Sequence, residues 1–189
     1  MRKITKLLRN KLVVSWALYD WANSVFSTTV ISGFFPVFFK EYWSAGVEPT
    51  VSTAQLGFAN SCSSAFVAVV LPFIGALIDV RPWKKAFLGA FTAGSIVSLL
   101  LLMFVGKGSY FYAAVIYAVS AGCYSAACGI YDSLLASVAD HENSDLISSL
   151  GYALGYLGGG LLFAINIVMY LKPSWFGLES GVSGVQWSF

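Results

Sequence analysis

The stretch that decides the fold is Gly75–Lys85, GALIDVRPWKK. A long apolar run ends here at an acidic residue, basic side chains follow, and a second apolar run begins directly after them. Each run has roughly the 20 residues that a helix needs to cross the hydrocarbon core of a bilayer. The stretch therefore predicts a tight, charged connection between two transmembrane helices.

The composition extends this prediction to the whole chain. Of its 189 residues 58% are hydrophobic and 11% are charged, whereas charged residues make up about 25% of a soluble domain. A transmembrane β-barrel would show alternating apolar and polar residues in segments of about ten, and these runs are continuous. We therefore expect an all-α polytopic membrane protein.

Five transmembrane spans are predicted outward from the charged connection. They lie at about 14–39, 56–78, 86–105, 110–135 and 146–171. Residues 1–13 form a basic amphipathic segment expected at the membrane surface, and residues 172–189 form an extracytoplasmic tail. The last residues, VQWSF, are typical of the start of a sixth helix, so we expect the N-terminal part of a longer protein.

Basic residues are distributed unevenly between the two ends of the spans. Eight of the eleven fall on the side of the N-terminus, namely Arg2, Lys3, Lys6, Arg9, Lys11, Arg81, Lys84 and Lys85. Because cytoplasmic loops are enriched in Lys and Arg, the N-terminus is expected inside the cell. We expect the protein in the bacterial cytoplasmic membrane.

A polar stripe follows the first span. Asp20 stands near its start, and Asn23, Ser24, Ser27 and Thr28 follow at helical spacing. A carboxylate inside a membrane span is costly and is by default a functional hypothesis. The stripe either lines a cavity, in which Asp20 binds substrate or a proton, or anchors helix packing near the interface.

The fourth span carries tyrosines on one face. Tyr110, Tyr117, Tyr124 and Tyr131 recur every seven residues, and Ser120 lies beside them. Tyrosine hydroxyls need hydrogen-bond partners when buried, so this face should contact protein or water. The two end tyrosines fit the aromatic belt of a membrane interface, which leaves Tyr117, Ser120 and Tyr124 as cavity candidates.

Two further features concern motion or packing. Asp132, at the cytoplasmic end of the fourth span, is expected to pair with Arg81 or Lys84, either as a latch or as a static strut. Glycines recur every four residues in the fifth span, at Gly151, Gly155 and Gly159. This spacing lets helix backbones approach closely, and it also suits a helix that bends or slides.

Other classes of site have little support. Cys62, Cys123 and Cys128 fall inside apolar runs, as small buried hydrophobes do. One histidine, His141, supplies too few ligands for zinc, and nucleotide-binding and hydrolase motifs are absent from the sequence. We expect no catalytic residue, metal, cofactor or nucleic-acid partner.

GALIDVRPWKK resembles the loop signature G-x-x-x-D-x-x-G-R-[RK], which lies between the second and third helices of the major facilitator superfamily. Gly75, Asp79 and Lys84 match it, while Pro82 and Trp83 replace the usual glycine and arginine. SWALYDWANSVFSTTVISGFFPVFF in the first span and SSLGYALGYLGGGLL in the fifth resemble the "unknown major facilitator" family. That family includes the fungal vacuolar amino-acid effluxer of autophagy.

The resemblance implies a transporter of two six-helix halves, with a cavity lined chiefly by the first and fourth helices of each half. This chain would supply five helices of the N-terminal half, and a C-terminal half or an equivalent partner would complete the cavity. The resemblance assigns a conformational gate to Gly75, Asp79, Arg81, Lys84, Lys85 and Asp132.

The function expected on this basis is alternating-access transport of a small polar solute, such as an amino acid, across a lipid bilayer. The alternative is a stand-alone five-helix scaffold or partner subunit without transport activity. A membrane enzyme ranks third, because it would need a cluster of acids and histidines at one membrane face, and the acidic 136–145 loop is better explained as solvated.

Overall fold

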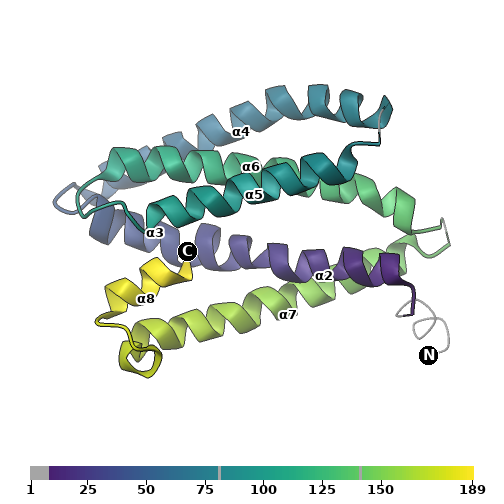
Figure 1. Ribbon diagram of the computed structural model, residues 1–189. Helices are drawn as coiled ribbons and strands as arrows, with labels where there is room; N and C mark the ends of the chain where they lie inside the picture. The colour runs from purple at the N-terminus through teal and green to yellow at the C-terminus, as the bar shows by residue number, and fades with distance from the viewer. Residues whose placement is uncertain (1–8, 81, 141) are drawn as a thin grey trace. The chain divides into compact units, whose positions relative to one another are not determined.

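The computed structural model describes residues 9–80, 82–140 and 142–189, with the backbone alone for Asp79. Every regular element in these ranges is helical. Five helices are long and apolar enough to cross a membrane (Figure 1). They are Lys11–Trp43, Pro49–Ile78, Lys84–Leu102, Tyr110–Val138 and Ser144–Leu171. The predicted all-α fold with five membrane-length helices is confirmed.

The first of these helices changes its hydrogen-bond pattern along its length. It consists of α2 (Lys11–Val25), the π-helical η1 (Phe26–Phe34), α3 (Phe35–Phe38) and the π-helical η2 (Phe39–Trp43). The other long helices are α4 (Pro49–Val80), α5 (Lys84–Leu102), α6 (Tyr110–Val138) and α7 (Ser144–Leu171). A 3-10 turn, η3 (Pro173–Phe176), and the short α8 (Gly181–Ser188) follow.

Local sequence explains where this first helix begins and why it widens. Asn10 caps α2, because its side-chain Oδ1 accepts a hydrogen bond from the Leu12 amide at 3.0 Å. Pro36 stands at the start of α3, where it has no N–H to donate and its ring crowds the carbonyl four residues earlier. The wider π-helical turns of η1 lie directly before this proline and relieve that crowding.

The chain divides into two compact units. The first consists of Met1–Gly33 and Ser133–Ser188, and the second of Phe34–Asp132 with Phe189. One boundary falls at the end of η1 and the other inside α6. Each unit therefore contains one part of the first helix and one part of α6.

In the first unit, the N-terminal part of the first helix and α7 lie side by side (Figure 1). Glycines make this contact possible. A methyl group added at Gly151 would lie 2.5 Å from the Trp16 ring, and one at Gly158 would lie 2.5 Å from the Trp21 carbonyl oxygen. Such distances are shorter than any real contact, so only glycine permits this approach of the two backbones.

The same helix pair is joined by a buried hydrogen bond. The Asn166 amide donates to Thr29 Oγ1 at 3.3 Å, and the two residues are 3% and 0% exposed. Hydrogen bonds between side chains of neighbouring helices help to hold transmembrane helices together. This bond fixes the register of α7 against η1.

In the second unit, aromatic side chains form a cluster around Trp43. The Trp43 ring is fully buried, its Nε1 donates to the Val105 carbonyl at 3.1 Å, and it stacks on Phe189 at 5.7 Å. The Gly108 amide donates to the Tyr42 carbonyl, and Gly108 has φ 81°, a conformation that favours glycine. The loop between α5 and α6 is therefore tied to the end of the first helix.

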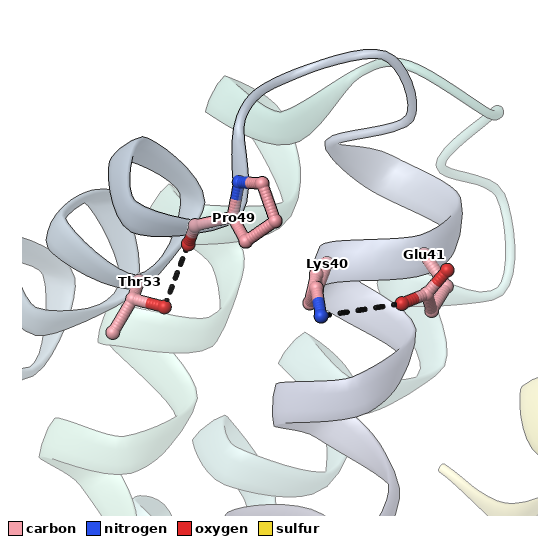
Figure 2. A network of polar contacts seen from close by, with 4 residues as sticks. All are labelled: Lys40, Glu41, Pro49 and Thr53. Carbon is pink, nitrogen blue, oxygen red and sulfur yellow. Dashed lines mark hydrogen bonds and ion pairs between the residues drawn. The ribbon is translucent and has the colours of Figure 1, made fainter.

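The connection from η2 to α4 carries polar contacts (Figure 2). Thr53 Oγ1 donates to the Pro49 carbonyl at 2.8 Å, and Lys40 pairs with Glu41 at 3.6 Å. Both charged side chains are exposed, and an exposed ion pair contributes little to stability. These groups mark the end of the first helix as a polar membrane boundary.

Exposure along α5 is inverted relative to that of a soluble helix. Its buried face includes Ser95 and Ser98, whereas Ile96, Val97 and Leu100 are exposed. Large exposed apolar surfaces are rare on soluble monomers, and lipid is the solvent in which this arrangement is stable. The chain is an integral membrane protein.

We predict that Gly158→Ala destabilises the protein whereas Gly160→Ala does not. The new methyl group at Gly158 would meet the Trp21 backbone, whereas nothing lies within 4 Å of one at Gly160. Overpacking typically costs about 1–3 kcal/mol in the free energy of unfolding, and Gly→Ala in a free helix position gains up to about 1 kcal/mol.

The measurement is the midpoint of thermal unfolding in detergent, with Gly160→Ala as the matched control on the same helix. Equal midpoints for the two variants would show that the helices do not depend on this contact.

Candidate functional site

The polar stripe of the first helix faces the glycines of α7. A methyl group at Gly155 would lie 2.5 Å from Ser24 Oγ and 3.0 Å from Asp20 Oδ2, and one at Gly159 would lie 2.8 Å from Thr28 Oγ1. Two features that the sequence predicted separately, the polar stripe and the glycine repeat, therefore meet in one interface of the first unit. Asp20 is half-buried there.

Hydroxyl groups in the stripe are satisfied within their own helix. Ser27 Oγ and Thr28 Oγ1 both donate to the Ser24 carbonyl, at 2.9 and 3.1 Å. Such local bonds compete with the backbone hydrogen bonds of the helix and often bend it. Here they lie where α2 passes into η1. Asn23 and Ser27 are half-buried, like Asp20.

Helix α6 places Tyr117 and Ser120 inside the second unit. The Tyr117 hydroxyl donates to Asn60 Oδ1 at 3.0 Å, and its ring stacks on Phe35 with centroids 3.9 Å apart. Tyr117 is 2% exposed and Ser120 is fully buried. The predicted polar face thus lies in protein, and the exposed side chain that continues it is that of Asn60.

A second polar contact joins α5 and α6 at the same face. Ser120 Oγ lies 3.1 Å from Ser95 Oγ and donates to the Ser95 carbonyl at 3.1 Å. Tyr124, one helical turn further on, is half-buried. Tyr117 and Ser120 therefore each bond to a different neighbouring helix, which holds α6 in a fixed rotation between α4 and α5.

The residues predicted to form a gate are only partly described. Arg81 lies outside the described residues, and of Asp79 only the helical backbone is described. Lys84 begins α5 and is half-buried, Lys85 is exposed, and Asp132 is exposed on α6. An added methyl group at Gly75 would meet nothing within 4 Å. The pairing of Asp132 with Arg81 or Lys84 stays a prediction.

Sequence reasoning missed Asn60 and Phe35, which contact Tyr117, and Asn166, which bonds to Thr29. Asn60 and Asn166 are side-chain amides inside membrane-length helices, and that position alone could have marked them as functional or structural. Phe35, which covers Tyr117, carries no such signal, because aromatic residues surround it in the chain.

The arrangement can bind polar groups. The first unit offers the Asp20 carboxylate beside hydroxyls and amides, the second unit offers hydroxyls and the Asn60 amide, and the part of the chain that the structure describes holds no cluster of three metal-ligating residues. A carboxylate recognises an ammonium group or a proton, and hydroxyls and amides bind polar groups of either kind.

Comparison with known proteins gives the family. Residues 50–180 match the family described as "Vacuole effluxer Atg22 like". The chain is 35% identical over 158 residues to "Uncharacterized MFS-type transporter YxiO" of Bacillus subtilis (strain 168), which is 83% of this chain and 37% of that protein. An "Uncharacterized protein" of Aquifex aeolicus (strain VF5) is 27% identical over 150 residues, which is 78% of this chain and 36% of that protein.

The chain thus spans little more than a third of the length of these two relatives. No solved structure matches it. The resemblance to this family is confirmed, and since the match extends over most of the chain, this membrane protein belongs to the vacuole effluxer Atg22-like family.

Proposed function

We propose that this chain supplies the N-terminal helices of a major facilitator transporter, which moves a small polar solute such as an amino acid by alternating access. The observation that carries the proposal is the half-buried carboxylate of Asp20, held against Gly155 within two membrane-length helices. Ionisable groups at such positions mark substrate or ion pathways, and the family match supports the same reading.

The solute-binding groups in this proposal are two polar sets, each described within its own unit. Asp20, Asn23 and Ser27 supply one polar set, and Tyr117, Ser120 and Tyr124 supply the other. Because Tyr117 and Ser120 are buried and bonded to Asn60 and Ser95, we propose that they position the polar surface. The carboxylate selects a solute with an ammonium group, which is the reason for favouring amino acids over sugars.

The glycines give the transport proposal a moving part. Gly151, Gly155 and Gly159 leave α7 without side chains on the face that meets the first helix. A contact of this kind permits close packing, and it permits one helix to slide on another when the hydrogen bond from Asn166 to Thr29 is released. We propose that α7 shifts along this face when the transporter changes conformation.

The gate and the orientation are part of the same proposal. Gly75, Asp79, Arg81, Lys84, Lys85 and Asp132 would control the change of conformation at the cytoplasmic face. The N-terminus would lie inside the cell, in the cytoplasmic membrane of a bacterium, and a sixth helix and a second six-helix half would complete the cavity.

The direct test is uptake of radiolabelled amino acids by liposomes that contain the full-length gene product. We expect saturable uptake of at least one amino acid. A stable protein that forms defined complexes but transports none of a broad panel of polar solutes would favour the scaffold alternative.

We predict that Asp20→Asn lowers uptake at neutral pH about tenfold or more, since hydrogen bonds to a charged group contribute about 1.5–3 kcal/mol. We also expect its uptake to vary less with pH than that of the wild-type protein. Glu179→Gln is the matched control, because Glu179 is an exposed acid outside the five helices. The same pH profile in Asp20→Asn and the wild type would contradict a role in coupling.

We predict that Asp79→Asn and Asp132→Asn slow turnover more than they weaken solute binding. A gate acts on the conformational step, so the maximal uptake rate should fall about tenfold, which corresponds to ~1.4 kcal/mol in the barrier, while the half-saturating concentration stays nearly constant. Asp140→Asn, in the acidic loop before α7, serves as the control. Wild-type rates in both gate variants would remove the gate assignment.

A further inference from the structure

Asn60 exposes a side-chain amide in the interior of a membrane-length helix. The part of α4 that can cross a membrane is Pro49–Ile78, and Asn60 is exposed on it. At 1.5 Å per residue, Asn60 lies about 16 Å from Pro49 and about 27 Å from Ile78 along the axis, well inside a hydrocarbon core of ~30 Å. An amide without partners is costly in hydrocarbon. This face of α4 is therefore expected to meet something more polar than lipid.

Tyr117 holds this amide in one orientation. The Tyr117 hydroxyl donates to Asn60 Oδ1 at 3.0 Å. Tyr117 itself is 2% exposed, and its ring stacks on Phe35 at 3.9 Å with 16° between the two planes. All three residues belong to the second unit. Because the oxygen end of the planar amide is engaged by a buried and stacked tyrosine, the nitrogen end is left for the exposed side.

The two N–H groups of Asn60 are unused among the residues that the structure describes. The bond from Tyr117 is the hydrogen bond of the Asn60 side chain there, and it uses Oδ1 alone. Exposed hydroxyls nearby on α4 differ, because Thr53 donates to the Pro49 carbonyl and Ser61 to the Gly57 carbonyl. A methyl group added at Gly57, about one turn before Asn60, would meet nothing within 4 Å. Asn60 thus offers two donors beside an open surface.

A carboxylate is the group that such donors bind best. Hydrogen bonds to an ionised acceptor are about twice as strong as those between neutral groups, and the solute proposed above carries a carboxylate as well as an ammonium group. The lysines and arginines that the structure describes lie at helix ends or in connections. They are Arg9, Lys11, Lys40, Lys84, Lys85, Lys107 and Lys172. In the interior of the described helices, neutral donors such as the Asn60 amide are therefore the groups that can bind a carboxylate.

We propose that Asn60 is a specificity-determining residue, whose Nδ2 donates to the carboxylate of the transported solute. Tyr117 is the positioning residue, because its hydroxyl bonds to Oδ1 and so turns the N–H groups outward. Phe35 supports this arrangement by stacking on the Tyr117 ring. The inference rests on the proposed function, and it adds the group of the solute that the second unit recognises.

The test uses liposomes that contain the full-length gene product. The probes are the twenty ¹⁴C-labelled amino acids, each assayed by itself. For each one that enters, two unlabelled competitors are compared, namely the same amino acid and the amine that lacks only its carboxylate. In the wild-type protein we expect the amino acid to compete about tenfold better than the amine or more, as the loss of a hydrogen bond to a charged group predicts.

Variants assign this preference to the amide. Asn60→Leu has a similar size and no N–H group, so the ratio between the two competitors should fall about tenfold. The half-saturating concentration should rise by a similar factor while the maximal rate stays nearly constant, as expected for a lost binding contact. Asn60→Asp keeps an acceptor for Tyr117 but also lacks the N–H groups, and it should weaken uptake at least as much.

Two further variants separate the role of Tyr117 from general effects on α4. Tyr117→Phe keeps the ring that stacks on Phe35 but loses the hydroxyl, so the half-saturating concentration should rise several-fold without a change in the maximal rate. Ser61→Ala is the matched control, because Ser61 is exposed next to Asn60 and its hydroxyl bonds within its own helix. We expect wild-type values for Ser61→Ala.

The outcomes distinguish this inference from the function on which it rests. If no amino acid enters liposomes with the wild-type protein, the proposed function fails and the inference fails with it. If amino acids enter but the amine competes as well as the amino acid in the wild-type protein, the inference fails alone. It also fails if the preference persists in both Asn60→Leu and Asn60→Asp. A shift in the midpoint of thermal unfolding without a change in this preference would show that Asn60 packs against a helix or lipid instead.

Discussion

The close approach of the first helix and α7 is the contact on which the first unit depends. Lipid supplies no hydrophobic force between two apolar helices, so they associate through van der Waals packing and hydrogen bonds. Gly151, Gly155 and Gly158 remove the side chains that would hold the backbones apart, and the bond from Asn166 to Thr29 then sets the register. This same approach brings Asp20 into a half-buried position beside α7.

The sequence was sufficient for the architecture because the bilayer imposes strong constraints on it. A span needs about 20 apolar residues and an internally satisfied backbone, so continuous runs such as the one before Asp79 predict helices directly. The glycine repeat and the polar stripe also follow from helical periodicity. That Gly155 lies on Asp20 could not be predicted, because periodicity gives the face of each helix and not the partner of that face.

Tyr117 illustrates the same limit in the second unit. Its seven-residue spacing predicted a face that needs hydrogen-bond partners, and the structure provides one, the Asn60 side chain. The spacing could not show that Phe35 would cover the ring. A partner in lipid must come from another helix, and its identity depends on the rotation of both helices, which the sequence of either one leaves open.

The first helix takes part in both units, and π-helical segments interrupt it close to the boundary between them. Before the end of η1, Ser24 and Thr28 meet the glycines of α7; after it, Phe35 and Trp43 join the aromatic cluster of the second unit. Since π-helical turns are rare and frequently occur at functional sites, these two segments are a structural reason to place function on this helix.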